Sequence, residues 1–141
     1  MTIKQLSVFI ENKTGRINEV TKILGTNGIN MTAFSLAENA DFGILRMIVS
    51  DVDKAVQVLK EAHFGVSVND VVCFCCPNVP GSLATVLEYL AKEDIFIEYM
   101  YAFSQGDTAN VVIRPTDINK CIDILTYYKC DLLNKNSLSQ C

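Results

Sequence analysis

The second half of this chain repeats the first half at a constant shift of 66 positions, since Gly81 corresponds to Gly15 and 81 − 15 = 66. No gap is needed to align the further pairs Asn12 with Asn78, Val20 with Val86, Leu24 with Leu90, Ile29 with Ile95, Asp51 with Asp117, Lys54 with Lys120, and Leu59 with Leu125. A long match at one fixed offset indicates a duplicated structural unit. We therefore expect two copies of one unit, at residues 1–69 and 70–135, followed by a polar tail at 136–141. The copies join at Asn69-Asp70 with almost no linker, so we expect them to pair within the chain.

The spacing of apolar residues predicts the elements of the first copy. We expect strands near residues 6–10, 29–36, 43–49 and 66–68, with a hairpin tip at Asn39-Ala40-Asp41. Thr14 is the predicted cap of a first helix that Gly25 and Asn27-Gly28 end. Ser50 or Asp51 is the predicted cap of a second helix. The predicted inward residues of that second helix are Val52, Ala55, Val56, Leu59 and Ala62.

The spacing of apolar residues in the second copy predicts the same order of strands and helices. Strands are expected at residues 71–76, 95–103, 110–114 and 131–133, with a hairpin around Gly106-Asp107 and with Pro115 ending its strand. Thr116 or Asp117 caps the last helix. The predicted helix faces are Leu83, Val86, Leu87 and Leu90, then Ile118, Cys121, Ile122, Leu125 and Tyr128. Each copy is thus β-α-β-β-α-β, and the fold class is α+β with two tandem ferredoxin-like units.

Composition excludes several classes of function. Half of the 141 residues are hydrophobic and the formal net charge is −4. No run of Lys or Arg is present, which argues against nucleic acid and anionic membranes as partners. We see neither an export signal nor an apolar run of ~18 residues, so we expect a cytoplasmic protein with reduced thiols.

The turn in each copy joins a strand through glycine to a helix. Backbone N–H groups at a helix start have no intrahelical acceptor, and the helix dipole adds positive charge there, which suits a carboxylate. Asn12 offers both a donor and an acceptor, which suits a zwitterion. The alternatives remain open that Asn12 closes an Asx-turn and that Gly15 serves only the backbone.

Other side chains have structural explanations that we favour. Arg16 is interpreted as a solvated cation, His63 as a residue at a helix end, and Glu98 as a surface position on its strand. Cys73 and Cys75 share one strand face while Cys76 points away, and no C-x-x-C turn is present. We therefore predict no metal and no cofactor, and interpret these cysteines as small buried hydrophobes.

The chain resembles a tandem pair of ACT domains over residues 3–69 and 70–134. The resemblance rests on the turn Asn12-Lys13-Thr14-Gly15-Arg16-Ile17 and on the strand entry Gly28-Ile29-Asn30-Met31. The second copy carries Asn78-Val79-Pro80-Gly81-Ser82-Leu83, but Asp94 and Phe96 replace the glycine and the asparagine of the strand entry.

ACT domains are regulatory modules that bind amino acids or other small ligands where two units meet. The resemblance implies a site between the first turn and the second strand of each copy. In the first copy these residues are Asn12, Gly15, Arg16, Ile17, Asn30 and Met31. In the second copy they are Asn78, Gly81, Ser82, Leu83, Phe96 and Ile97. Phe96 narrows the second site, so we expect the second site to contribute less to ligand binding than the first.

Three functions follow as hypotheses. The first is a stand-alone sensor, not an enzyme, that binds a small amino acid and acts as a homodimer or by docking on a metabolic enzyme. The second is a regulatory or interaction subunit whose ligand site is vestigial. The third is a small acylphosphatase-like enzyme in which Arg16 and Asn30 converge on a phosphate.

Overall fold

The computed structural model describes residues 1–38 and 41–134, so Asn39 and Ala40 of the expected hairpin tip and the tail at 136–141 lie outside the described residues. Contacts divide the chain into two compact units. The first unit is Lys4–Asn69, and the second is the chain from Asp70 onward together with Met1–Ile3. Within the described ranges, no helix has both the length and the apolar character needed to cross a membrane.

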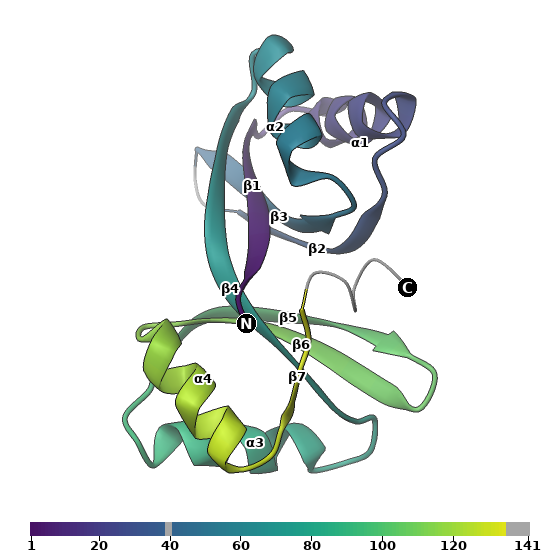
Figure 1. Ribbon diagram of the computed structural model, residues 1–141. Coiled ribbons are helices and arrows are strands. Elements are labelled where there is room, and N and C mark those ends of the chain that lie inside the picture. The colour runs from purple at the N-terminus through teal and green to yellow at the C-terminus, as the bar shows by residue number, and fades with distance from the viewer. Residues whose placement is uncertain (39–40, 135–141) are drawn as a thin grey trace. The chain divides into compact units, whose positions relative to one another are not determined.

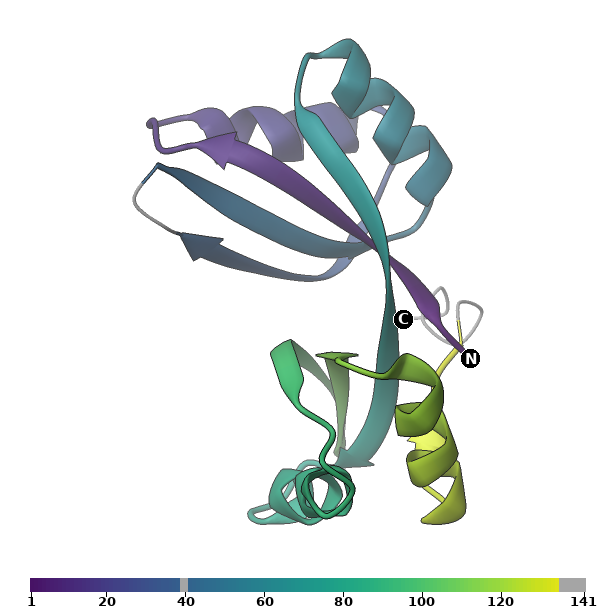
Figure 2. The same cartoon turned by 90° about the vertical axis from the view of Figure 1, so that its left-hand side faces the viewer.

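The first unit is an antiparallel sheet covered on one face by two helices (Figure 1). Strands β1 (Ile3–Glu11) and β2 (Met31–Glu38) both pair with β3 (Phe42–Val49) in antiparallel register. With β4 (Gly65–Pro77) the strand order is β2-β3-β1-β4. Figure 2 shows both helices on the same side of this sheet. The elements in chain order are β1 (Ile3–Glu11), α1 (Arg16–Thr26), β2 (Met31–Glu38), β3 (Phe42–Val49), α2 (Val52–Glu61) and β4 (Gly65–Pro77).

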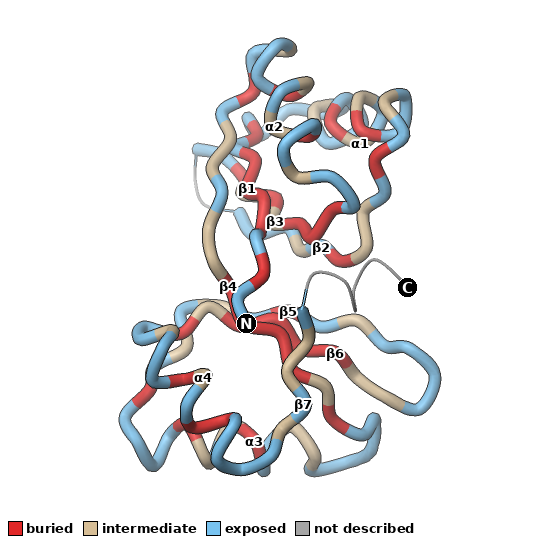
Figure 3. Tube along the Cα trace, in the orientation of Figure 1, coloured by how far each residue is buried: buried red, intermediate tan, exposed pale blue. Residues whose placement is uncertain are grey.

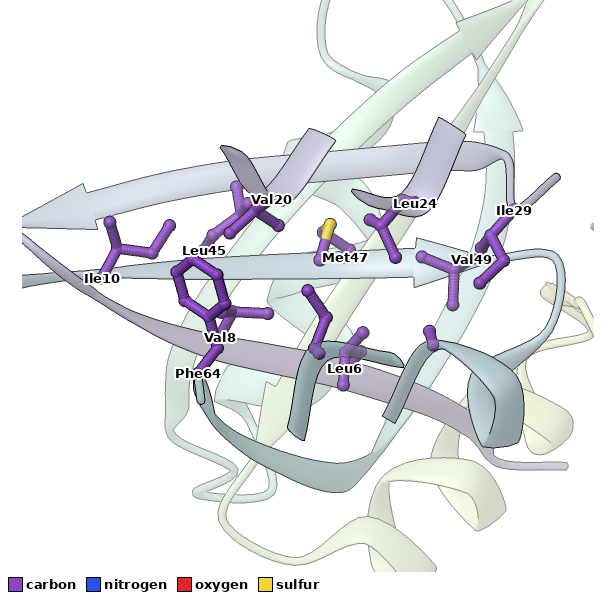
Figure 4. Close-up of a cluster of buried hydrophobic side chains, with 12 residues drawn as sticks. Leu6, Val8, Ile10, Val20, Leu24, Ile29, Leu45, Met47, Val49 and Phe64 are labelled. Atoms are coloured by element: carbon purple, nitrogen blue, oxygen red, sulfur yellow. The ribbon is translucent and has the colours of Figure 1, made fainter. Parts of the chain in front are cut away.

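The core of the first unit lies between the sheet and the helices (Figures 3 and 4). Alternate residues of β1 point toward the helices, because side chains of a strand alternate between its faces. Leu6, Val8 and Ile10 therefore pack with Val20 and Leu24 of α1. Ala55 and Leu59 of α2 are buried as predicted, and Val52, Val56 and Ala62 pack against this core.

The second unit repeats the arrangement. Its strand order is β7-β4-β6-β5, with β5 and β7 each antiparallel to their neighbours and with both helices on one face (Figure 1). The elements after β4 are α3 (Ser82–Ala91), β5 (Ile97–Gln105), β6 (Thr108–Pro115), α4 (Ile118–Tyr127) and β7 (Asp131–Leu132). The prediction of two β-α-β-β-α-β units in the α+β class is confirmed.

The repeat extends to backbone conformation. Gly15 has φ 90° and ψ −9°, and Gly81 has φ 87° and ψ −12°. Asp51 and Asp117 cap α2 and α4 in the same way, each accepting a hydrogen bond from the N–H three residues later. A carboxylate that accepts from the third helical N–H satisfies one of the orphan donors of the helix start.

Several predicted details of the elements are wrong. Thr14 does not cap α1: Gly15 holds the cap position in a left-handed conformation, and no side chain accepts there. Gly25 lies inside α1, which continues to Thr26. Strands β2 and β5 begin at Met31 and Ile97, two residues later than expected, because the chain first leaves each helix through a positive-φ residue, Gly28 or Asp94.

Two further corrections concern the end of each unit. The expected strands at 66–68 and 71–76 are one strand, β4, which runs without a break through Asn69 and Asp70. A continuous strand satisfies its backbone hydrogen bonds without a turn, so no linker is needed. Tyr128 is 40% exposed rather than inward, since it lies beyond the end of α4.

Candidate functional site

The turn before α1 is held by its own backbone. The Lys13 N–H donates to the Glu11 carbonyl at 2.8 Å, and the Arg16 N–H donates to the Lys13 carbonyl at 3.3 Å. Gly15 takes the positive φ that this turn requires, at little steric cost. Helix α1 therefore starts at the surface, where the N–H groups of its first turn have no intrahelical acceptor.

A pocket of about 360 Å³ lies beside this turn, within the first unit. Asn12 and Ile17, two of the predicted site residues, line it. The other lining residues are Ile10, Glu11, Lys13, Thr14, Leu36, Glu38 and Gly43. The pocket thus joins the turn to the ends of β2 and β3.

Gly43 is a pocket residue that the sequence reasoning missed. A Cβ at this position would lie 3.3 Å from Leu36 Cδ1 and 3.8 Å from Asn12 Oδ1. The absent side chain leaves the floor of the pocket open beside the Asn12 carboxamide. A glycine inside a strand often marks such a close approach, and that signal could have identified it.

The pocket wall carries charge of both signs. Lys13 Nζ lies 3.1 Å from Glu11 Oε2. The hydrogen bond from Lys13, and then the charges of Lys13 and Arg16, lower the pKa of the Glu11 carboxyl. Glu38 adds a second carboxylate to the wall. An ammonium group and a carboxylate group could therefore both find a partner there.

Arg16 is not the solvated cation that the sequence favoured. Its guanidinium lies over the Phe64 ring at 4.5 Å from the centroid, and its Nη1 lies 2.8 Å from Glu19 Oε2. Its Nε is buried without a hydrogen-bond partner. Although it belongs to the predicted site, Arg16 does not line the pocket.

Asn30 and Met31 lie at the opposite end of the first unit from Asn12. Glu11 pairs with Phe42 at one end of β3, and Met31 pairs with Val49 at the other. Seven residues of strand correspond to roughly 24 Å. The Asn30 N–H donates to Ser50 Oγ at 2.9 Å. Within this unit Arg16 and Asn30 therefore do not converge, which removes the geometric basis of the acylphosphatase-like hypothesis.

The turn of the second unit has the same backbone conformation as the turn before α1. The Asn78 N–H donates to the Asp107 carbonyl at 2.9 Å, and Gly81 precedes α3 as Gly15 precedes α1. Phe96 is 67% exposed just before β5. Leu83 and Ile97 pack against the core of the second unit.

A second pocket of about 350 Å³ lies elsewhere in this unit, and Ser82 is the one predicted site residue that lines it. Its walls come from β4, α3 and the segment between α4 and β7. The remaining lining residues are Cys75, Cys76, Pro77, Thr85, Val86, Tyr89, Tyr128, Lys129, Cys130 and Asp131.

The positions of His63 and Glu98 agree with the structural explanations that the sequence analysis favoured for them. His63 has φ 68° just after α2, and its backbone N–H donates to the Lys60 carbonyl at 2.9 Å. Glu98 is exposed, with Oε2 3.9 Å from Arg114 Nε. In the part of the chain that the structure describes, no group of three or more His, Cys, Asp or Glu side chains is placed to hold a metal ion.

Comparisons with known proteins place the chain in a family. A family model described as "ACT domain pair" matches residues 1–141. A crystal structure of a protein from Bacteroides thetaiotaomicron shares 55% identity, covers 100% of this chain and 98% of its own, and has a TM-score of 0.95. No curated protein matches.

Two more distant structures show the same fold. The ligand-free regulatory subunit of aspartate kinase from Thermus thermophilus has 14% identity and a TM-score of 0.64, covering 88% of this chain and 90% of its own. The regulatory subunit of aspartate kinase from Thermus flavus has 14% identity and a TM-score of 0.64, covering 87% and 88%. The family match and the 55% identical structure, together with the two units observed, show that this chain belongs to the ACT domain pair family.

Proposed function

We propose that this chain is a regulatory protein that binds a small zwitterionic amino acid at the pocket beside Gly15. Family membership supports a regulatory role in which a small molecule is bound. The observation that carries the finer proposal is the pocket of about 360 Å³, whose wall combines a helix start, the Asn12 carboxamide and two glutamates.

The chemistry of the wall favours a zwitterion over a simple anion. The start of α1 attracts a carboxylate through its N–H groups and its dipole. Glu11 and Glu38 outnumber Lys13, so an ammonium group is favoured at the other side of the pocket. Ile17 and Leu36, which are 40% and 49% exposed, offer apolar contact to a short side chain. The volume is near the low end of the range for small-molecule pockets.

The proposed affinity is modest. Charge-assisted hydrogen bonds contribute ~1.5–3 kcal/mol each, and ordering the ligand offsets much of that. We expect a Kd between about micromolar and millimolar. A thermal-shift screen of the common amino acids identifies the ligand, because binding to the folded state alone raises Tm.

Gly15→Val and Gly81→Val form a matched pair of variants. Both glycines have φ near +90° with no atom within 4 Å of an added Cβ, so both substitutions impose the same backbone strain. Calorimetry should show at least tenfold weaker binding for Gly15→Val and less than about twofold change for Gly81→Val. Asn12→Ala should weaken binding by about tenfold. Equal losses at both glycines would contradict a binding site confined to the first unit.

The remaining parts of the proposal concern assembly. We expect a cytoplasmic homodimer that acts on a metabolic enzyme rather than catalysing a reaction, with a neighbouring ACT unit completing the ligand site through residues such as Asn30 and Met31. Light scattering with and without the identified amino acid tests the dimer. A subunit with a vestigial site is the alternative, and it predicts no ligand-dependent rise in Tm.

A further inference from the structure

The second pocket lies where the second copy has smaller side chains than the first copy at two equivalent positions. In the first unit, Arg16 stacks on Phe64, which is 5% exposed. The shift of 66 positions replaces these residues by Ser82 and Cys130, both of which line the second pocket. The smaller side chains leave open the place that the guanidinium and the ring fill in the first unit.

Three cysteines line this pocket, and two of them, Cys76 and Cys130, lie next to the last pair of the β4–β7 ladder. The ladder pairs Phe74 with Leu132 and Cys75 with Asp131. If its register is continued by one residue, Cys76 lies opposite Cys130, which immediately precedes β7. Cys76 belongs to the apolar cluster of the second unit, and Cys130 packs against that cluster. Both also line the pocket.

The hydrogen bonds between β4 and the β7 segment indicate whether Cys76 and Cys130 would form a hydrogen-bonded or a non-hydrogen-bonded pair. The Leu133 N–H donates to the Cys73 carbonyl at 2.9 Å, which makes Cys73 and Leu133 a hydrogen-bonded pair. Pair types alternate along an antiparallel ladder. In the continued register, Cys76 and Cys130 take the place of a non-hydrogen-bonded pair, for which Cα atoms are ~4.5 Å apart and side chains are closest. A disulfide needs Cα atoms about 4.4–6.8 Å apart.

We propose that Cys76 and Cys130 form a reversible disulfide, with a small disulfide such as oxidised glutathione as the oxidant that enters through the pocket. The Cys130 thiolate attacks one sulfur of the oxidant, whose S–S bond breaks and whose other half leaves as a thiol after taking a proton. The Cys76 thiolate then attacks Cys130 Sγ and releases the second half as a thiol. Two protein thiols are oxidised by two electrons, and one small disulfide is reduced.

Accessibility sets the order of these steps. Cys130 is half-buried, whereas Cys76 is only 6% exposed, so Cys130 reacts first and Cys76 resolves the mixed disulfide. Cys121 belongs to the same apolar cluster but is fully buried and does not line the pocket. Cys75 contributes to the pocket wall, but strand alternation directs its side chain to the other face.

The reaction should be slow at neutral pH. Burial, and to a smaller degree Asp131 and Cys76, raise the pKa of Cys130; burial and then Cys75 raise that of Cys76. The other titratable groups of the pocket are Tyr89, Tyr128 and Lys129, and Cys121 lies in the adjoining core. Since the thiolate is the nucleophile, the rate should rise about tenfold from pH 7 to pH 8.

The test uses the full-length reduced chain, oxidised glutathione and peptide mapping by mass spectrometry after acid quenching. A linked Cys76–Cys130 peptide should dominate, and Tm should rise by several degrees because the bridge closes a loop of 130 − 76 = 54 positions. Cys75→Ser is the matched control and should oxidise like the wild type.

Two variants separate the steps. Cys76→Ser should stop at a glutathione adduct on Cys130 and lose the rise in Tm, while Cys130→Ser should protect Cys76 from reaction. Circular dichroism confirms that each variant is folded before oxidation. The proposal is overturned if oxidation links Cys75 or Cys141 instead, if only adducts form on the wild type, or if Cys76→Ser keeps the rise in Tm.

Discussion

At the scale of single residues, position 16 and its counterpart at 82 share a backbone conformation but differ in their side-chain contacts. Arg16 begins α1 as Ser82 begins α3, and both follow a glycine of positive φ. Arg16 extends across Phe64 and pairs with Glu19, which is replaced by Thr85 in the second unit. Thr85 Oγ1 instead donates to the Gly81 carbonyl at 3.1 Å. The side chains, not the turn, decide where a pocket remains.

Arg16→Ala should lower the free energy of unfolding by about 0.5–1 kcal/mol. The loss comes mainly from the cation–π contact with Phe64, because a partly exposed ion pair contributes little. Ser82→Ala occupies the same place in the second unit, lacks such a contact, and should change stability by less than about 0.5 kcal/mol. Urea titration of both variants measures the difference. An equal effect at the two positions would show that the ring contact contributes nothing.

At the scale of elements, the sequence predicted best what local chemistry alone decides. The aspartates before α2 and α4 were identified as possible caps, and both accept the expected hydrogen bond. Pro115 ends β6 as predicted. Alternation along 71–76 also placed Cys73 and Cys76 on opposite faces, and Cys76 belongs to the helix-side core.

The errors occurred where two requirements compete. Thr14 is a good capping residue, but the glycine after it takes the cap position because the turn needs a positive φ. Polar Asn69-Asp70 looked like a boundary between strands, yet β4 passes through them, and both residues are half-buried in this strand. Of the residues that line the candidate pocket, Asn12 and Ile17 could be predicted from the turn. Gly43 and Leu36 could not, because only the sheet register brings them there.

Removing either cap should destabilise the chain by similar amounts. Asp51→Ala and Asp117→Ala should each cost about 1 kcal/mol, because each leaves one helical N–H without its acceptor. Asp→Asn at the same positions is the control, since asparagine caps nearly as well, and should cost only a few tenths of a kcal/mol. Thermal and urea unfolding give both values. A loss with Asn as large as with Ala would attribute the effect to charge rather than to the hydrogen bond.

At the scale of the whole molecule, the duplication gave two units that share a backbone fold but differ in the side chains that line their pockets. The first unit keeps a polar pocket at its turn and closes the other side of α1 with an arginine and an aromatic ring. In the second unit a pocket takes that place, and it is lined by three cysteines and by Tyr89 and Tyr128, whose ring centroids lie 3.9 Å apart in a stacked pair. Under the two proposals above, the first unit binds a small zwitterion and the second unit forms a disulfide. A ligand and an oxidant could act on the same protein without competing for a site.

The stability of the molecule should fall in alkaline solution because of a buried thiol in α4. Burial, and then the charge of Asp117, raise the pKa of Cys121 to about 12, whereas an unfolded thiol titrates near 8.5. The folded state holds this proton more tightly, so its contribution is complete below about pH 8.5 and is lost as the pH rises toward 12. With a reductant present, the free energy of unfolding should drop by roughly 2 kcal/mol between pH 8.5 and 10.5. Cys121→Ala removes the titrating group but leaves every lysine and tyrosine in place. Its free energy of unfolding should start lower at pH 7 and fall less steeply with pH, and parallel curves for the variant and the wild type would contradict the assignment to Cys121.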